Sequence, residues 1–355
     1  MDVYATRPGR GLEDVMSGYR AVEATAGGDF TLVERKFEPP GAGQVRIAVE
    51  ACGVCHSDVA GIMNMTGSRP SSVSVVPGHE VIGRIDAVGD GVSGWRVGQR
   101  VGVGYLGGHC GECAMCRRGD FVYCTDQPVL GDSQQGGYAE YLTARTSGLV
   151  AVPDDIPAAE LAPLMCAGLT VHHALMTSAA RTGDLVAVQG IGGLGHLGIQ
   201  YARALGFQVA AIARGRSKKE LALRLGAHHY IDSAEGDPGQ ALQELGGARV
   251  VLATASSGAS MSPLVGGLAV RGQLVVVGVA QDPIEVGTVP LIFGARSIVG
   301  SLTGTPRDNE DNVGFAHAHG IRPMVETVPL EQAGEAYARM MSGDARFRMV
   351  LEVGR

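Results

Sequence analysis

The sequence is poor in aromatic residues, and it contains no long uninterrupted apolar run. Aromatic side chains make up 5% of it, with a single tryptophan. No stretch approaches the roughly 18 apolar residues that a membrane-spanning helix needs. The net charge of −7 includes no basic stripe, which argues against nucleic acid and against a membrane surface as partners. The N-terminus lacks the charged and then apolar layout of a signal peptide, so we expect a cytoplasmic protein.

Cysteine is also scarce, with 7 residues in 355, whereas glycine is abundant, with 54. An odd number of cysteines in a cytoplasmic chain points to metal binding or catalysis before disulfides. Glycines spread along the whole chain indicate tight turns and close backbone approaches in a sheet-rich fold that holds a ligand. At this length we expect about two domains. Residues 1–15 have no clear period and are expected to be either a loose leader or the result of a misplaced start.

The pattern of apolar residues changes near Pro153, which predicts two structural bodies (domains) of different architecture. Before it, short glycine-punctuated strands predict a β-rich, partly barrel-like body, with strands at 44–50, 80–89, 99–104 and 137–144. After it, a helix is expected over 155–175, and apolar strands then alternate with helices. These strands are 185–189, 208–213, 249–254 and 274–280, and the helices are 193–205, 217–225 and 259–268.

Such alternation predicts a doubly wound parallel sheet covered by helices on both faces. Beyond residue 297 shorter strands and two helices return, one of them over 331–341. We assign these to the first body. The predicted fold class is therefore α/β, with a β-rich catalytic domain at 1–160 and 298–355 and a dinucleotide-binding domain at 161–297.

Four of the cysteines fall in one short loop, residues 109–124, with the spacing C-x2-C-x2-C-x7-C. They are Cys110, Cys113, Cys116 and Cys124. Four thiolates complete a tetrahedral Zn²⁺ shell with no open position, so this metal would be structural. An iron–sulfur cluster uses similar short spacings, but the long final gap and the absence of a following Cys-Pro favour zinc. Unrelated buried cysteines are improbable at this density.

A second constellation is scattered over the motifs GVCHSD (53–58), PGHEVIG (77–83) and MCAGLT (165–170). Cys55, His79 and Cys166 supply two thiolates and one imidazole, which leave a tetrahedral metal one vacant position, as in a catalytic zinc. Asp58 is expected to orient a ligand, and Glu80 is expected to be a near ligand of the metal that exchanges with water. Taken singly, each of these residues is weak evidence. Cys52 has no partner in the pattern and is interpreted as a packed core thiol.

The segment LVAVQGIGGLGHLGIQYARALG (185–206) runs from a strand through a glycine turn into a helix. Gly190, Gly192 and Gly195 form the dinucleotide pattern G-x-G-x-x-G, and Ile191, Gly193 and Leu194 lie between them. The first glycine allows the tight turn, the second a close approach of a pyrophosphate, and the third close helix–strand packing. The helix N-terminus favours phosphate.

The next strand ends at Ala213 without the acidic residue that holds the ribose hydroxyl of NAD. Arg214, Arg216 and Lys218 follow and could receive a 2′-phosphate, which favours NADP(H) over NAD(H). The alternative is that they are solvated cations at the start of a helix.

Taken together, these motifs resemble the zinc-containing medium-chain alcohol dehydrogenases. The resemblance runs from about Tyr19 to RFRMVL (346–351), with the motifs in family order. It implies a GroES-like catalytic domain joined to a Rossmann domain, with the active site between them. It also implies two zinc ions per subunit, one of them catalytic and bound by Cys55, His79 and Cys166.

The resemblance further assigns residues around the substrate and the cofactor. It implies that Ser57 takes the alcohol proton and that His56 and Arg348 contact cofactor phosphate. Thr170 and the backbone near Val277 and Val279 would flank the nicotinamide. Many family members have a histidine two residues after the aspartate of the GVCHSD motif, but this chain has Ala60 there, which puts the last step of the proton relay in doubt.

The function predicted from this resemblance is reversible interconversion of a small alcohol and an aldehyde or ketone with NAD(P), in which zinc acts as a Lewis acid. Tyr105, Leu106 and residues 63–65 are expected to line the substrate pocket. The family suggests a homodimer or homotetramer, with 297–302 as a strand that pairs across subunits. A zinc polyol or amino-alcohol dehydrogenase, a non-catalytic nucleotide-binding relative and a zinc-sensing or storage protein are the alternatives.

Overall fold

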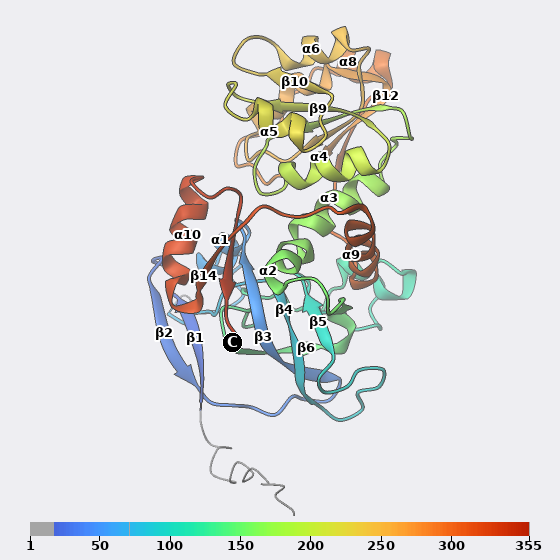
Figure 1. The fold of residues 1–355 in the computed structure, drawn as a ribbon. Coiled ribbons are helices and arrows are strands. Elements are labelled where there is room, and N and C mark those ends of the chain that lie inside the picture. The colour runs from blue at the N-terminus through green and yellow to red at the C-terminus, as the bar shows by residue number, and fades with distance from the viewer. Residues whose placement is uncertain (1–17, 71, 355) are drawn as a thin grey trace, which may run out of the picture.

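The computed structural model describes residues 18–70 and 72–354, which form two lobes joined along one side (Figure 1). One lobe is β-rich and contains the first and the last strands of these residues, and the other is built on a parallel sheet. The leader expected at 1–15 lies outside the described residues. None of the described helices has the length and apolar character needed to cross a membrane.

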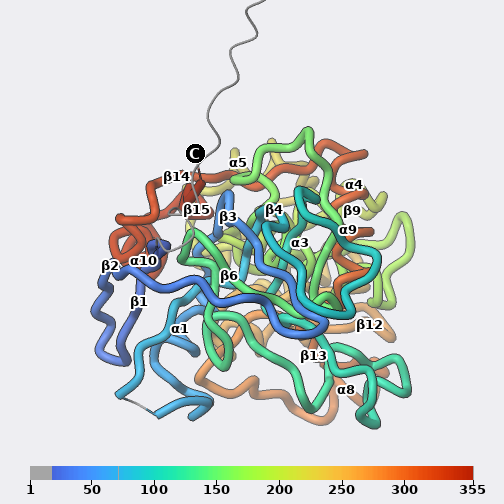
Figure 2. Tube along the Cα trace, turned by 90° about the horizontal axis from the view of Figure 1, so that it is seen from below, coloured from blue at the N-terminus to red at the C-terminus, as the bar shows by residue number. Residues whose placement is uncertain are grey.

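In the β-rich lobe, seven strands form a mixed sheet in the order β14-β15-β3-β4-β5-β7, with β6 paired to β3. These strands are β3 (Gln44–Val54), β4 (Glu80–Val88), β5 (Arg100–Val103), β6 (Tyr141–Arg145), β7 (Leu149–Ala151), β14 (Val325–Pro329) and β15 (Arg348–Glu352). The antiparallel ribbon of β1 (Tyr19–Ala24) and β2 (Phe30–Arg35) lies beside helix α10 (Ala333–Ser342), as Figures 1 and 2 both show. The ring of Phe30 there packs 5.2 Å from that of Tyr337.

The second lobe contains six parallel strands in the order β10-β9-β8-β11-β12-β13, as far as the chain is described. These strands are β8 (Leu185–Gln189), β9 (Gln208–Ala213), β10 (His229–Asp232), β11 (Ala248–Ala253), β12 (Leu268–Val276) and β13 (Ser297–Gly300). In chain order this arrangement reads 3-2-1-4-5-6, which is the order of dinucleotide-binding sheets. The predicted doubly wound parallel sheet is therefore confirmed.

The helices connect and cover these strands. In the β-rich lobe and at the junction they are α1 (Asp58–Ile62), α2 (Ala158–Leu161), α3 (Ala167–Met176) and α9 (Pro306–His319). In the parallel-sheet lobe they are α4 (Gly195–Ala204), α5 (Lys219–Arg224), α6 (Pro238–Glu244), α7 (Gly258–Met261) and α8 (Thr288–Gly294). Both faces of the sheet are buried, because Val250 and Leu252 of β11 belong to one apolar core and Val251 and Ala253 to another.

Three features of the sequence prediction are wrong in detail. The helix expected over 155–175 is broken into α2, a 3₁₀ turn (Ala162–Met165) and α3, because the backbone of Cys166 (φ −129°, ψ −71°) leaves the helical region. The helix expected over 259–268 ends in a second 3₁₀ turn, Ser262–Val265, and strand β12 already begins at Leu268. Strand β13 pairs with β12, so residues 298–300 belong to the parallel sheet and not to the β-rich body.

One apolar cluster extends across both lobes, in addition to the cluster that each lobe has of its own. The cluster contains Ile82 and Val350 from the β-rich sheet, Leu197 and Val250 from the parallel-sheet lobe, and Leu164 from the turn between them. Helices α2, α3 and α9 lie at the junction of the lobes (Figure 1). This junction carries Cys166, so its packing sets where that thiol points.

Candidate active site

Residues from three distant segments meet at the junction of the two lobes. Cys55 follows the end of β3, His79 and Glu80 lie at the start of β4, and Cys166 lies at the break before α3. One potential ligand atom from each of these four residues lies within 4.8 Å of the others. The structure therefore brings together all four residues that the sequence placed near one metal.

The geometry of this cluster fits a zinc ion. The sulfurs of Cys55 and Cys166 are 4.0 Å apart, close to the edge of about 3.8 Å expected when two thiolates bind one tetrahedral zinc. His79 Nε2 is buried and has no hydrogen-bond partner among the described residues, and the same holds for Glu80 Oε2. Buried polar atoms are rarely left unpaired, so these atoms indicate a ligand that belongs here.

Asp58 holds the imidazole of His79 through a contact with its Nδ1 atom. Its Oδ1 lies 2.7 Å from His79 Nδ1, which leaves Nε2 for the metal. Its Oδ2 accepts hydrogen bonds from the Tyr138 hydroxyl, at 2.9 Å, and from the Cys55 backbone N–H, at 3.0 Å. Burial alone would lower the pKa of His79, but the charges of Asp58 and Cys55 and the hydrogen bonds to both together outweigh it and raise that pKa. The sequence reasoning had missed Tyr138, which no motif distinguishes.

The pKa values of Cys55 and Glu80 in this cluster are also shifted. A hydrogen bond from Cys166, assisted by the nearby His79, holds the pKa of Cys55 well below its usual value, although burial opposes this. Burial raises the pKa of Glu80 to about 7, while the buried Arg348 paired with it pulls in the other direction. The ring of Tyr105 stands edge-on to that of His79, with centroids 5.1 Å apart.

The four cysteines of residues 109–124 form a second cluster of ligand atoms within 4.8 Å of one another. Cys110 Sγ lies 3.6 Å from Cys124 Sγ and 3.9 Å from Cys116 Sγ, again near the tetrahedral edge. Backbone N–H groups donate to three of the sulfurs, those of Cys110, Cys113 and Cys124. Hydrogen bonds from the backbone N–H groups of Cys116 and Thr125 lower the pKa of Cys113 to about 5. Burial and the neighbouring sulfurs raise the pKa of Cys116 to about 12 in the absence of a metal. A tetrahedral metal in this loop would have all four positions taken by protein.

The glycine loop between β8 and α4 is shaped as the motif requires. Gly190 has φ +92°, a conformation that side chains rarely adopt. A Cβ at Gly195 would lie 1.7 Å from the carbonyl oxygen of Gly190, so the helix can pack this closely only without a side chain. Beside Gly192 there is open space, which suits the close approach of a phosphate.

The basic residues near this loop differ in their burial and in whether another group already pairs with them. Arg348 is buried, and its Nη1 lies against Gly193, so it stands between the glycine loop and Glu80. Lys218 donates to the carbonyl of Ile191 at 2.8 Å, and Arg216 pairs with Glu235 at 2.7 Å. Arg214 is exposed and makes no ion pair within the described ranges.

The remaining residues expected at the site differ in their exposure. His56 and Ser57 are exposed beside Cys55, Thr170 is buried on α3, and Val279 is exposed. The backbone N–H of Val277 donates to Ala253 O at 3.0 Å. Cys52 is fully buried in the β-rich core, as a packed thiol would be.

Comparison with known proteins now adds to this geometry. The family description "Alcohol dehydrogenase GroES-like domain" matches residues 41–154, and "Zinc-binding dehydrogenase" matches residues 193–318. The alcohol dehydrogenase patD of Penicillium expansum is 43% identical over 332 residues, which cover 94% of this chain and 96% of that protein. This chain belongs to the zinc-containing alcohol dehydrogenase family. Its predicted activity class, oxidation of a CH–OH group or the reverse, is confirmed with it.

Solved structures agree with this placement. CAD from Helicobacter pylori, complexed with NADP(H), has a TM-score of 0.83 and 25% identity, with 95% of this chain and 98% of that chain covered. Acetophenone reductase from Geotrichum candidum, in complex with NAD, has a TM-score of 0.81 and 26% identity over 95% and 97% of the two chains. One of these two neighbours was solved with NADP(H) and the other with NAD, so both forms of the nicotinamide cofactor occur among proteins with this fold.

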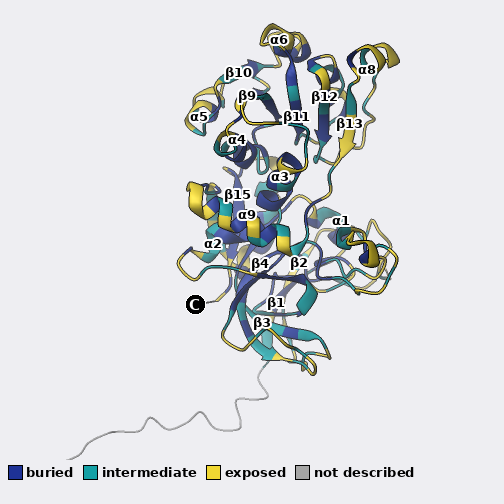
Figure 3. Ribbon diagram, turned by 90° about the vertical axis from the view of Figure 1, so that its right-hand side faces the viewer, coloured by how far each residue is buried: buried dark blue, intermediate teal, exposed yellow. Residues whose placement is uncertain are grey.

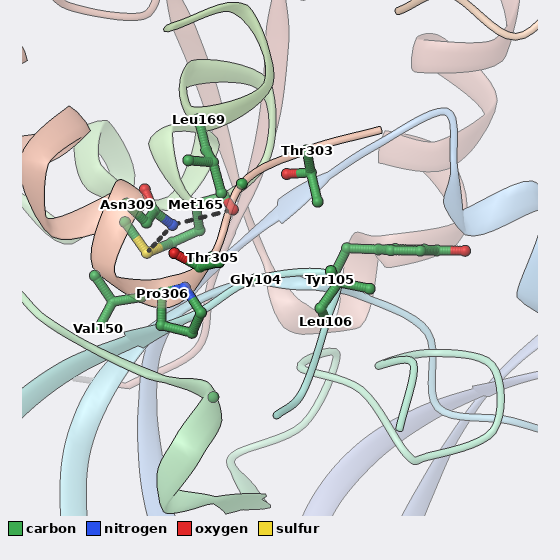
Figure 4. A pocket seen from close by; sticks show the side chains of 12 residues that line it. Gly104, Tyr105, Leu106, Val150, Met165, Leu169, Thr303, Thr305, Pro306 and Asn309 are labelled. Atoms are coloured by element: carbon green, nitrogen blue, oxygen red, sulfur yellow. Dashed lines mark hydrogen bonds between the residues drawn. The ribbon is translucent and has the colours of Figure 1, made fainter. Parts of the chain in front are cut away.

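In this alcohol dehydrogenase a small hollow lies near the cluster of Cys55, His79 and Cys166, since its lining includes Met165, which precedes Cys166, and Tyr105, whose ring contacts that of His79 (Figure 4). It is lined by Tyr105, Leu106, Leu169 and Thr303, among others. Tyr105 and Leu106 were expected at the substrate pocket. Residues 63–65 are not among its lining, and Met63 and Met65 are exposed.

Proposed function

We propose that Cys55, His79 and Cys166 bind the catalytic zinc of this alcohol dehydrogenase and that the loop at 109–124 binds a second, structural zinc. The observation that supports this most strongly is the buried, unpaired Nε2 of His79 next to two sulfurs 4.0 Å apart. When bound, zinc supplies Lewis acidity to the alcohol oxygen, and the nicotinamide supplies the hydride acceptor.

The protein's own groups hold the substrate and move its proton. Ser57, exposed directly after the Cys55-His56 pair, accepts the hydroxyl proton of the alcohol and passes it outward. Asp58 keeps His79 oriented, as its 2.7 Å contact with Nδ1 indicates. Because Ala60 has no titratable group, the proton leaves through the cofactor ribose, water or the exposed His56.

The cofactor would lie across the glycine loop, with its pyrophosphate over residues 190–195. The open space at Gly192 and the guanidinium of Arg348 against Gly193 support this position. His56 is the second candidate contact for phosphate, and Thr170 and the backbone near Val277 and Val279 would flank the nicotinamide. The domain division we propose is a catalytic domain at 1–160 and from about 301 onward, with the nucleotide domain between.

We expect NADP(H) to be preferred over NAD(H), with Arg214 as the residue that receives the 2′-phosphate. Ala213 replaces the acidic residue, and Arg214 has no competing carboxylate among the described residues. A hydrogen bond from a charged donor contributes about 1.5–3 kcal/mol, so Arg214→Ala should raise the KM for NADP+ roughly 10- to 100-fold. The KM for NAD+ should not change. Arg216→Ala is the matched control, since Arg216 is already paired with Glu235. A wild type that prefers NAD+ would contradict the proposal.

The substrate would be a small alcohol or its aldehyde or ketone, held between Tyr105, Leu106, Leu169 and Thr303 in a mixed apolar site. A panel of alcohols and aldehydes, assayed with both cofactors on material of known zinc content, tests the proposal. Two zinc ions per chain and turnover of simple alcohols support it. Turnover of polyols or amino alcohols alone would favour a zinc polyol or amino-alcohol dehydrogenase. Cofactor binding without any turnover would favour a non-catalytic nucleotide-binding protein. We propose that this chemistry takes place in the cytoplasm.

The subunits are proposed to associate through strand β13 and helix α8, as a homodimer or within a homotetramer. Strand β13 is at the edge of the parallel sheet, where unpaired backbone groups invite another strand. Both elements are exposed on the outside of the lobe (Figure 3), and Ile292 and Phe293 of α8 are 71% and 84% exposed. So large an apolar exposure is typical of an interface.

We therefore expect Phe293→Asp to shift the protein to monomers, because a carboxylate there would be buried in the interface. The mass of the particle in solution, measured by light scattering or sedimentation, checks this. Leu223→Asp on α5, next to the opposite edge strand β10, is the control and should leave the assembly intact. A Phe293→Asp variant with the wild-type mass would contradict this interface.

A further inference from the structure

The 3₁₀ turn Ala162–Met165 ends at Cys166 with carbonyl groups that no helix continues to satisfy. The chain leaves the helical conformation at Cys166, and α3 begins anew at Ala167. The carbonyls of Leu164 and Met165 therefore need other donors. Both residues are 1% exposed, so water is not an adequate replacement. The position of the Cys166 thiol depends on how these two carbonyls are held.

Two asparagines of α9 supply the donors. Asn312 Nδ2 donates to Leu164 O at 3.1 Å, and Asn309 Nδ2 donates to Met165 O at 3.3 Å. The second amide also reaches the sulfur of Met165 at 3.6 Å, and Figure 4 shows both contacts of Asn309. The asparagines lie three residues apart, on one face of the helix, and are 1% and 0% exposed.

A tyrosine from the nucleotide domain completes the network. Tyr201 of α4 donates its hydroxyl to Asn312 Oδ1 at 2.5 Å, and Asn312 Nδ2 also donates to Asn309 Oδ1 at 2.9 Å. This hydroxyl fixes which way the Asn312 amide points, because it needs an acceptor and the amide oxygen provides one. Tyr201 is fully buried, and its helix is the one that follows the glycine loop.

We propose that Tyr201, Asn312 and Asn309 are positioning residues that hold Cys166 in place as a zinc ligand. Zinc–sulfur distances tolerate only about 0.2 Å of error, so a turn that relaxes would misplace the third ligand. The network also connects that ligand to the helix of the dinucleotide loop. The inference depends on the proposed assignment of Cys166 to the catalytic zinc.

The test uses the full-length protein with Asn312→Leu, which keeps a similar volume but removes both the donor and the acceptor. Zinc per chain is measured after dialysis against the chelator dipicolinate, and the visible spectrum is recorded after replacement of zinc by Co²⁺. We expect zinc at one site to be held about 10- to 100-fold more weakly, as for other residues that support metal ligands. The cobalt–thiolate absorption should shift, which a purely structural role would not cause.

Two further variants keep the experiment decisive. Tyr201→Phe retains the ring and removes only the hydroxyl, so it should shift the spectrum in the same direction and by less, even if Asn312→Leu fails to fold. Leu264→Ala, in the core on the other face of the parallel sheet, controls for general destabilisation and should keep both ions. Wild-type zinc retention and spectra in Asn312→Leu overturn the inference. If Asn312→Leu does not fold, an unchanged Tyr201→Phe overturns it.

Cys166→Ser separates this inference from the assignment it depends on. If this variant keeps both zinc ions with an unchanged cobalt spectrum, Cys166 is not a ligand and the proposed site itself is wrong. If it loses one ion while Asn312→Leu and Tyr201→Phe behave like the wild type, the site stands and only the positioning network is refuted.

Discussion

Replacing His79 with alanine is expected to abolish turnover while the chain stays folded. Its Nε2 is buried without a partner among the described residues, and it faces the sulfurs of Cys55 and Cys166. Without the imidazole, the catalytic zinc loses one of three proposed ligands. A metal Lewis acid contributes several kcal/mol to the transition state, so kcat/KM should fall by at least about 1,000-fold. Cys55→Ser should have a similar effect.

The measurement combines kinetics with zinc analysis and a melting curve. We expect one zinc ion per chain in place of two and circular dichroism like that of the wild type. Cys52→Ala is the control, because Cys52 is equally buried on β3 and packs in the β-rich core, but it is not among the ligand atoms of the cluster. It should keep both ions and its turnover. A His79→Ala variant with wild-type kcat/KM would rule out the proposed catalytic site.

Cys113→Ser is expected to destabilise the protein without removing its catalytic centre. The loop at 109–124 has few apolar side chains, and the ring of Tyr123 is 60% exposed, so little besides metal holds the loop in shape. Loss of a structural zinc site should lower the melting temperature by roughly 4 °C if about 3 kcal/mol is lost. Zinc analysis should again find one ion, here with cofactor binding retained.

Limited digestion with trypsin gives a local readout of the same change. Arg117 and Arg118 are exposed in a short 3₁₀ turn within the loop, and the cysteines on either side restrain it. We expect trypsin to cut the chain after Arg117 and Arg118 much faster in Cys113→Ser than in the wild type. Glu112→Gln, in the same loop but outside the sulfur cluster, is the control. A soluble, cofactor-binding Cys113→Ser variant with unchanged melting temperature would contradict a structural metal.

The fold was predicted well from the sequence at positions where the structure tolerates only one type of residue. Gly190 and Gly195 are required by a positive φ and by a close contact, and the alternation of apolar strands and helices could only build a covered parallel sheet. The convergence of Cys110, Cys113, Cys116 and Cys124 was equally predictable, because thiols at such short spacing in one loop lie close together in the fold. These features are local, or depend on motifs in a fixed order.

The parts that were not predicted depend on contacts between distant segments. The break at Cys166 is stabilised by Asn309 and Asn312, which are more than 140 residues away in the chain. Tyr138 supports Asp58 from 80 residues away. Nothing in the residue type of an asparagine or a tyrosine distinguishes such a role from an ordinary place on a helix. Similarly, β13 was assigned to the wrong body because a short apolar strand fits either sheet.

The apolar cluster that runs from one lobe into the other also constrains how this protein can evolve. A domain that closes around its own interior can be exchanged as a module. Here Ile82 and Val350 pack in the same cluster as Leu197 and Val250, so a replacement nucleotide lobe would have to match a surface it did not evolve against. Substitutions on the two sides of the junction must therefore compensate one another, and recombination within the family should succeed only between parents that agree at these positions.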